Sequence, residues 1–190
     1  MTITINDIKT GMGLVMGDNI WMVNEVNHVK PGKGAAFVRC RLKNLKTEAV
    51  QEMTFRASDK LEEAYLEEKN LTYQYNAGDV FHFMDTETYE EMTISRDQLG
   101  EAVKFLQDNM GVTTVCFRGK IVKVILPNFL IAQIKETEPG FKGDSSRSGT
   151  KPAKIDTGAN VQVPLFINIG DWIKIDTRDG QGQYVERVNK

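Results

Sequence analysis

The chain has 190 residues, with 24 Lys and Arg against 26 Asp and Glu, so its formal charge is −2. This near-neutral balance excludes a polybasic protein that binds nucleic acid through bulk charge alone. Hydrophobic residues make up 41% of the chain and charged residues 26%, which is typical of a folded globular protein and excludes the disordered and collagen-like classes.

No targeting or membrane segment is expected. The first residues lack a basic region followed by an apolar run, and nowhere do about 18 apolar residues follow one another. The two cysteines, Cys40 and Cys116, lie far apart in strand-like sequence, which predicts buried thiols in a reducing compartment. We therefore expect a cytoplasmic protein without a membrane partner.

Short strands separated by turn signals predict a mainly β architecture, as in small barrels and sandwiches. The alternating pattern predicts strands over residues 21–26, 36–42, 71–75, 113–117, 120–126, 160–165 and 172–176. Turn signals stand at Pro31-Gly32, Gly78-Asp79, Pro127-Asn128, Pro139-Gly140 and Asp179-Gly180.

One segment departs from the strand pattern. Ser95-Arg96-Asp97-Gln98 has the composition of a capping box, in which Ser95 and Gln98 satisfy each other's backbone N–H groups. A helix is therefore predicted to begin there and to run for about three turns. Its apolar face would pack on a barrel through Leu99, Ala102, Val103, Leu106 and Met110.

Composition shifts divide the chain into three predicted units, residues 1–64, 65–128 and 129–190. The middle unit is acidic, with 10 Asp and Glu against 6 Lys and Arg. Each unit of about 60 residues supports only a modest core and needs its neighbours for rigidity.

A basic stripe lies in the first unit. No Asp or Glu occurs between Val26 and Thr47, whereas six cations do: Lys30, Lys33, Arg39, Arg41, Lys43 and Lys46. Within it, Pro31, Gly32 and Gly34 allow a tight reversal that places Lys33 at the apex. Such a loop is commonly a solvated hairpin turn; the alternative is a lysine presented on a stiff arm towards RNA. Alternation puts Arg39, Arg41 and Lys43 on one side of a strand.

Known catalytic and metal-binding patterns are missing from the sequence. His28 and His82 are the only histidines, the cysteines lack CxxC spacing, and no phosphate-binding loop or nucleophile motif occurs. We expect no catalytic residue, no metal and no cofactor. The acidic run 85–91 could supply paired carboxylates, but a solvated strand face is the favoured interpretation.

Three separated groups of residues resemble the bacterial elongation factor P family. They lie in the family's order, one group in each predicted unit: 28–39; 78–79 with 83–90; and 136–144 with 151–153, 157–167 and 170–171. The resemblance covers essentially the whole chain. It implies a KOW/SH3-like N-terminal barrel followed by two OB-fold barrels, in an L-shaped arrangement with the outline of tRNA.

The resemblance also implies a role in translation. Members of this family bind the 70S ribosome between the P and E sites and relieve stalling at consecutive prolines by positioning the P-site peptidyl-tRNA. The implied partners are rRNA, this tRNA and an enzyme that modifies the apical lysine, and a monomer is expected.

By position, the family's apical lysine is Lys33, a candidate for modification. Its neighbours Lys30, Pro31, Gly32, Gly34, Arg39, Arg41 and Lys43 are the candidates for tRNA and rRNA contacts. The resemblance further assigns an E-site mRNA loop to Gly143, Asp144 and Ser145, where Ser145 replaces the family's threonine. It assigns contacts with the small subunit and the tRNA to Tyr184 and Arg187.

Two alternatives stay open. One is an elongation-factor-P-like paralogue with the same fold, which the intact loop at 31–34 disfavours. The other is an OB-fold protein that binds single-stranded RNA. Against it stand 12 acidic and 3 basic residues over 62–110, which would repel a strand along two barrels.

Overall fold

The structure is a computed structural model that describes residues 2–32, 34–139 and 149–189. Almost all of its regular structure is β, so the predicted mainly β architecture is confirmed. All seven predicted strands overlap observed ones, which are β3, β4, β7, β10, β11, β14 and β15.

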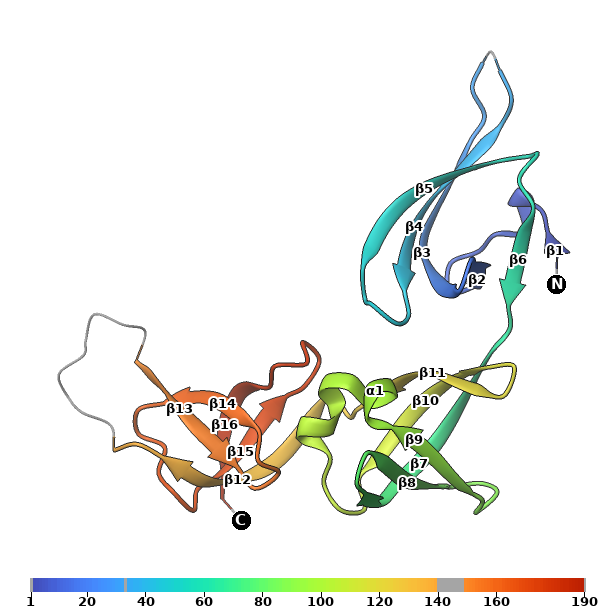
Figure 1. The fold of residues 1–190 in the computed structure, drawn as a ribbon. Helices are drawn as coiled ribbons and strands as arrows, with labels where there is room; N and C mark the ends of the chain where they lie inside the picture. The colour runs from blue at the N-terminus through green and yellow to red at the C-terminus, as the bar shows by residue number, and fades with distance from the viewer. Residues whose placement is uncertain (1, 33, 140–148, 190) are drawn as a thin grey trace. The chain divides into compact units, whose positions relative to one another are not determined.

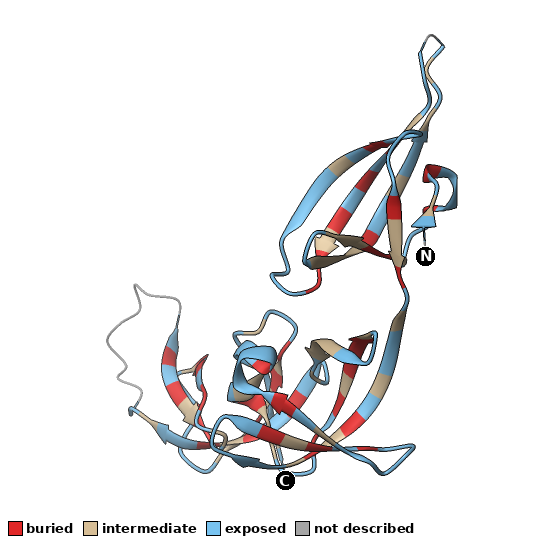
Figure 2. Ribbon diagram, turned by 45° about the vertical axis from the view of Figure 1, so that its right-hand side comes forward, coloured by how far each residue is buried: buried red, intermediate tan, exposed pale blue. Residues whose placement is uncertain are grey.

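The N-terminal sheet has six strands in the order β1-β6-β2-β3-β4-β5 (Figure 1). It consists of β1 (Thr2–Ile3), β2 (Gly13–Met16), β3 (Asn19–Val29), β4 (Phe37–Asn44), β5 (Val50–Arg56) and β6 (Leu61–Ala64), with a 3-10 turn η1 (Ile5–Asp7) after β1. Buried and exposed residues alternate along β4, as period-2 side-chain geometry requires (Figure 2). Leu14 and Val23, both 0% exposed, lie in the core that these strands cover.

A second sheet has five strands in the order β11-β10-β7-β8-β9. It consists of β7 (Leu66–Ala77), β8 (Val80–Asp85), β9 (Glu91–Ser95), β10 (Gly111–Phe117) and β11 (Lys120–Ile125). Three aromatic rings pack together in its core: Tyr73 lies against Phe83 with ring centroids 5.4 Å apart, and against Phe81 at 6.2 Å. Gly78 (φ +64) provides the left-handed turn residue between β7 and β8.

The predicted helix begins where expected but is much shorter. Both halves of the capping box form, and the backbone N–H of Ser95 donates to Gln98 Oε1 at 3.0 Å. The α-helix α1 spans only Arg96–Leu99, and a 3-10 helix η2 (Gly100–Phe105) follows. The length prediction is wrong because Gly100 adopts φ +55 and ψ −131, which ends the α-helix after one turn.

The C-terminal sheet closes into a barrel, in the order β12-β13-β14-β16-β15. Its strands are β12 (Phe129–Thr137), β13 (Thr150–Ile155), β14 (Asn160–Pro164), β15 (Trp172–Asp176) and β16 (Gln183–Val188). Closure occurs through β14 and β16, which are parallel and share the single register pair Gln162↔Gln183. β-branched residues fill the interior, among them Ile134, Ile155, Ile173 and Ile175.

Internal contacts divide the chain into two compact units. One comprises Met1–Lys69 and Thr114–Lys123, and the other Asn70–Thr113 and Val124–Lys190. The first unit thus contains the N-terminal sheet, and the second contains the whole C-terminal barrel together with η2. The division at 64/65 and 128/129 stays a prediction.

Both cysteines are buried and free, as the sequence predicts. Burial raises the pKa of the Cys40 thiol, which keeps it protonated. Among the described residues, no helix is long and apolar enough to cross a membrane.

We expect Leu14→Ala to lower the free energy of unfolding by about 3 kcal/mol, because it leaves a cavity in a fully buried site. Val50→Ala, at a strand position that is 47% exposed, is the control and should cost less than about 0.5 kcal/mol. Urea denaturation measures both. Equal losses would contradict the core assignment.

Candidate functional site

The hairpin of β3 and β4 carries the loop that the sequence analysis selects. Residues 30–36 connect the two strands at the far end of the hairpin (Figure 1). Lys30 and Gly32 are exposed, and Gly34 has φ +110, a conformation that glycine adopts without strain. Lys33, the predicted apex, lies outside the described residues.

The candidate cations Arg39, Arg41 and Lys43 project from the same face of β4. Arg39 and Arg41 are exposed and Lys43 is half-buried, while the residues between them are buried: Val38, Cys40 and Leu42. The predicted shared surface is therefore confirmed as a geometric arrangement.

Carboxylates interrupt this face, although none occurs in the sequence stretch 26–47. Arg41 Nη1 lies 3.4 Å from Glu25 Oε1 on β3, and Glu52 on β5 is its register partner on the other side. The absence of acids from this stretch of sequence does not extend to its surroundings in space, because neighbouring strands bring acids beside it. Arg41 is partly neutralised.

Lys43 is neutralised as well. The Glu48 carboxylate forms ion pairs with both Lys43 and Lys123, the latter on β11. Partial burial opposes ionisation of Glu48, but hydrogen bonds from Lys123 and Lys43 hold its pKa below the usual range. Lys43 therefore contributes little free positive charge to the outer face.

Two arginines nearer the loop keep their charge available. Arg39 faces Asn27 and Thr54 across the neighbouring strands, and Arg56 on β5 is in register with Phe37 at the loop end of β4. In the described part of the chain, neither arginine has an ion-pair partner. Sequence reasoning missed Arg56, since only the β4–β5 register brings it to this face.

The candidate mRNA loop, Gly143, Asp144 and Ser145, lies outside the described residues. The strands on either side of it are joined by a buried lysine. Lys151, 6% exposed, donates from Nζ to the backbone oxygen of Glu138 at 2.7 Å. This contact fixes the end of β12 against the start of β13.

Tyr184 and Arg187 both lie on β16, three residues apart, so a regular strand would place them on opposite faces. A β-bulge changes this: Ile175 pairs with Tyr184 and Lys174 with Glu186, which leaves Val185 as the extra residue. Arg187 then pairs with Ile173. The two candidates are thus in register with residues on one face of β15.

The long turn before β16 is well ordered by Asp179. Its carboxylate accepts hydrogen bonds from the N–H groups of Gln181 and Gly182, at 2.9 and 3.2 Å, and from the Gln183 side chain at 2.8 Å. The bond from Gln181 is the main cause of a lowered pKa for Asp179. The turn therefore holds Tyr184 at a defined place.

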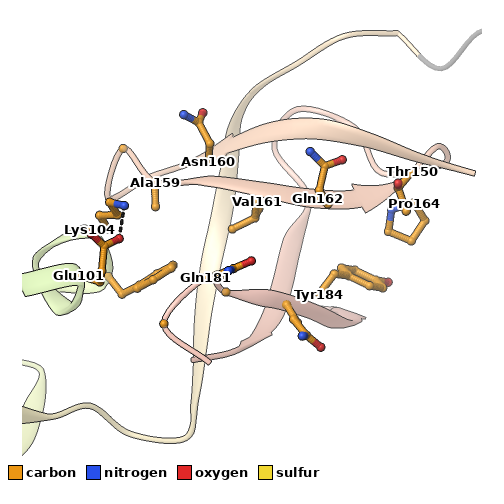
Figure 3. A pocket seen from close by; sticks show the side chains of 15 residues that line it. Glu101, Lys104, Thr150, Ala159, Asn160, Val161, Gln162, Pro164, Gln181 and Tyr184 are labelled. Atoms are coloured by element: carbon orange, nitrogen blue, oxygen red, sulfur yellow. Dashed lines mark hydrogen bonds and ion pairs between the residues drawn. The ribbon is translucent and has the colours of Figure 1, made fainter. Parts of the chain in front are cut away.

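A groove of about 620 Å³ runs between η2 and the seam of β14 and β16 (Figure 3). Glu101 and Lys104 form an ion pair at one end, and Tyr184 lies towards the other. The other residues that line it are uncharged, and they include the amides Asn160, Gln162, Gln181 and Gln183.

The acidic run is a turn and not a strand face, which corrects the sequence interpretation. Asp85, 3% exposed, ends β8, and its Oδ1 accepts hydrogen bonds from the N–H groups of Glu87 and Thr88. His82 contacts the Glu91 carboxylate and stacks on Tyr75 at 4.4 Å. Over the described ranges, no cluster of three His, Cys, Asp or Glu could hold a metal.

We expect Lys151→Met to lower the free energy of unfolding by about 1.5–3 kcal/mol. The variant keeps the unbranched stem but removes the charge-assisted hydrogen bond from the buried ammonium group to the Glu138 carbonyl oxygen. Lys154→Met is the control on the same strand: its side chain is 43% exposed and pairs with Glu136 at 3.3 Å, so the loss should stay below about 1 kcal/mol. Denaturant melts that give equal losses would contradict this role of Lys151.

Three family models match consecutive segments of the chain. The elongation factor P KOW-like domain matches residues 4–61, the elongation factor P OB domain 66–124, and the elongation factor P C-terminal domain 131–187. Proteins named elongation factor P from Pelotomaculum thermopropionicum and Moorella thermoacetica are each 47% identical over 186 residues, covering 98% of this chain and 100% of theirs.

Solved structures give a fold-level likeness. A translation initiation factor 5A from Methanococcus jannaschii has a TM-score of 0.50 at 22% identity, covering 66% of this chain and 94% of its own. A protein of the same family from Naegleria fowleri has a TM-score of 0.52 at 18% identity, with 66% and 98% coverage. The sequence matches are the more specific finding, and by them the chain belongs to the elongation factor P family of translation elongation factors, which act on the ribosome.

Proposed function

We propose that this protein binds the 70S ribosome between the P and E sites and stimulates peptide-bond formation at consecutive prolines. Its partners there are the P-site peptidyl-tRNA and rRNA, and its place of action is the cytoplasm. The observation that carries the proposal is the match to three family models in order along one chain. It is supported by a hairpin whose available positive charge lies near the loop at 30–36.

Correct orientation of the two reactants is enough to accelerate peptide-bond formation. Proline is a secondary amine with a fixed φ, so it aligns poorly as donor and as acceptor. Holding well-oriented reactants together can be worth about 7–11 kcal/mol at the limit. A factor that positions the tRNA therefore needs no catalytic group of its own, and we propose that it acts as a binding factor and not as an enzyme.

The proposed contacts divide among the domains 1–64, 65–128 and 129–190. Lys33, alone or extended by a modifying enzyme, would reach towards the CCA end of the tRNA. Lys30, Pro31, Gly32 and Gly34 would support it, and the face of β4 would contact RNA phosphates. In the C-terminal barrel, the loop Gly143-Asp144-Ser145 would approach E-site mRNA, and Tyr184 and Arg187 the small subunit and tRNA.

We expect Lys33→Ala to abolish rescue of consecutive-proline synthesis in a reconstituted translation system, with the wild type purified from its native source. The melting temperature should stay unchanged, because Gly32 and Gly34 on either side of this position are exposed and substitutions at exposed sites cost little. Lys60→Ala, which changes an exposed cation of the same unit, should retain full rescue. Rescue by Lys33→Ala would contradict the apical role, and failure of the wild type itself would favour the RNA-binding alternative.

The charge arrangement on β4 predicts an order of effects on ribosome binding. Arg39→Ala should weaken binding more than Arg41→Ala, and reduce the slope of log affinity against log salt by about 1. Glu25→Gln should strengthen binding, because it frees Arg41 from its partner.

Ribosome co-sedimentation between low and moderate salt measures these effects. Equal losses for the two arginine variants, or binding that does not depend on salt, would show that this face makes no phosphate contacts.

A further inference from the structure

An aromatic side chain from η2 packs against the turn before β16 of the C-terminal barrel. Phe105, the last residue of η2, is only 1% exposed. A Cβ atom added to Gly182, in the turn before β16, would lie 2.7 Å from two ring carbons of Phe105 and 3.2 Å from Ile175 Cγ2. The ring therefore occupies the space that any side chain at position 182 would take.

Hydrogen bonds join the same two segments around this contact. Thr157 Oγ1, in the β13–β14 turn, donates to the backbone oxygen of Lys104 at 2.7 Å. Gln107 Nε2 donates to the backbone oxygen of Ile131 on β12 at 2.9 Å. Residues 104–107 are thus attached to the barrel by one buried ring and by hydrogen bonds to β12 and to the β13–β14 turn.

The turn that contains Gly182 is held by interactions of its own, besides its packing against Phe105. Gly182 has φ +77, and its N–H donates to Asp179 Oδ1 at 3.2 Å. Gly180, two residues earlier, has a similar φ of +71, but the nearest atom to its added Cβ is Glu101 Cβ at 4.0 Å. Both positions need glycine for their backbone, whereas only position 182 also needs it for space.

We propose that Phe105 and Gly182 are positioning residues: the ring seated against Gly182 fixes the orientation of the C-terminal barrel relative to the segment 70–113. The significance for translation rests on the proposed function. A factor whose domains form one rigid body can make its separated contacts with tRNA together. A factor with a loose joint between its domains must lose conformational freedom on binding, which weakens the affinity. The contact at position 182 would thus set how well Tyr184 and Arg187 are placed for their partners.

The first test measures orientation in the full chain, without ribosomes. Backbone amide residual dipolar couplings give one alignment tensor for residues 70–113 and another for 129–189. The tensors should agree in the wild type and in Gly180→Ala, which incurs the same left-handed backbone strain. In Gly182→Ala they should diverge, with at least about a twofold fall in the order of one segment.

A compensating change tests the steric cause. Adding Phe105→Leu to Gly182→Ala removes ring atoms where the new methyl group enters, so the tensors should agree again. Phe105→Leu alone should loosen the joint while both parts stay folded, which keeps the inference testable should Gly182→Ala fold poorly. Identical tensors in wild type, Gly182→Ala and Phe105→Leu would overturn it, as would equal disturbance by Gly180→Ala and Gly182→Ala.

The translation assay then tests the consequence separately. Gly182→Ala should raise the concentration that gives half-maximal proline rescue by about tenfold, and Gly180→Ala should not. Diverging tensors with an unchanged half-maximal concentration would show that the joint exists but does not serve binding. Absence of rescue by the wild type would count against the proposed function and leave the dipolar-coupling result standing.

Discussion

Strands such as β4, β14 and β15 bury alternate side chains in a small core and leave the side chains between them partly or fully open to solvent. On β4 this division separates Val38, Cys40 and Leu42 from the cations at 39, 41 and 43. Such strands are anchored from one side only, so register, turns and side chains packed between elements add to their stiffness. The functional surfaces therefore depend on the same backbone pairing that makes the core.

The strand pattern could be predicted because period-2 alternation is local, and all seven predicted strands exist. The capping box was equally local, but the helix length depended on Gly100 and its left-handed backbone. Local patterns do not show which residues face each other across neighbouring strands. Glu25 faces Arg41, Glu48 reaches Lys43 and Arg56 joins the loop end through contacts across turns and neighbouring strands, which no local pattern reports.

The candidate contacts in the C-terminal barrel show the same limit. The family resemblance singled out Tyr184 and Arg187, yet a spacing of three predicts opposite faces. The extra residue Val185 restores a common register with β15. Likewise, the sequence of η2 reads as an ordinary apolar face, and only the folded chain reveals that Phe105 requires a glycine 77 positions later. Bulges and close approaches of this kind are decided by tertiary structure.

The pairing of charges along the β3–β4 hairpin has a directional consequence. Near its base the cations Arg41 and Lys43 are matched by Glu25 and Glu48, while Lys30, Arg39 and Arg56 near the loop have no ion-pair partner among the described residues. The positive potential thus rises from base to tip, on a chain whose total charge is −2. A polyanion approaching from solution meets a graded field that turns the hairpin tip-first, so encounter is oriented before any specific contact forms.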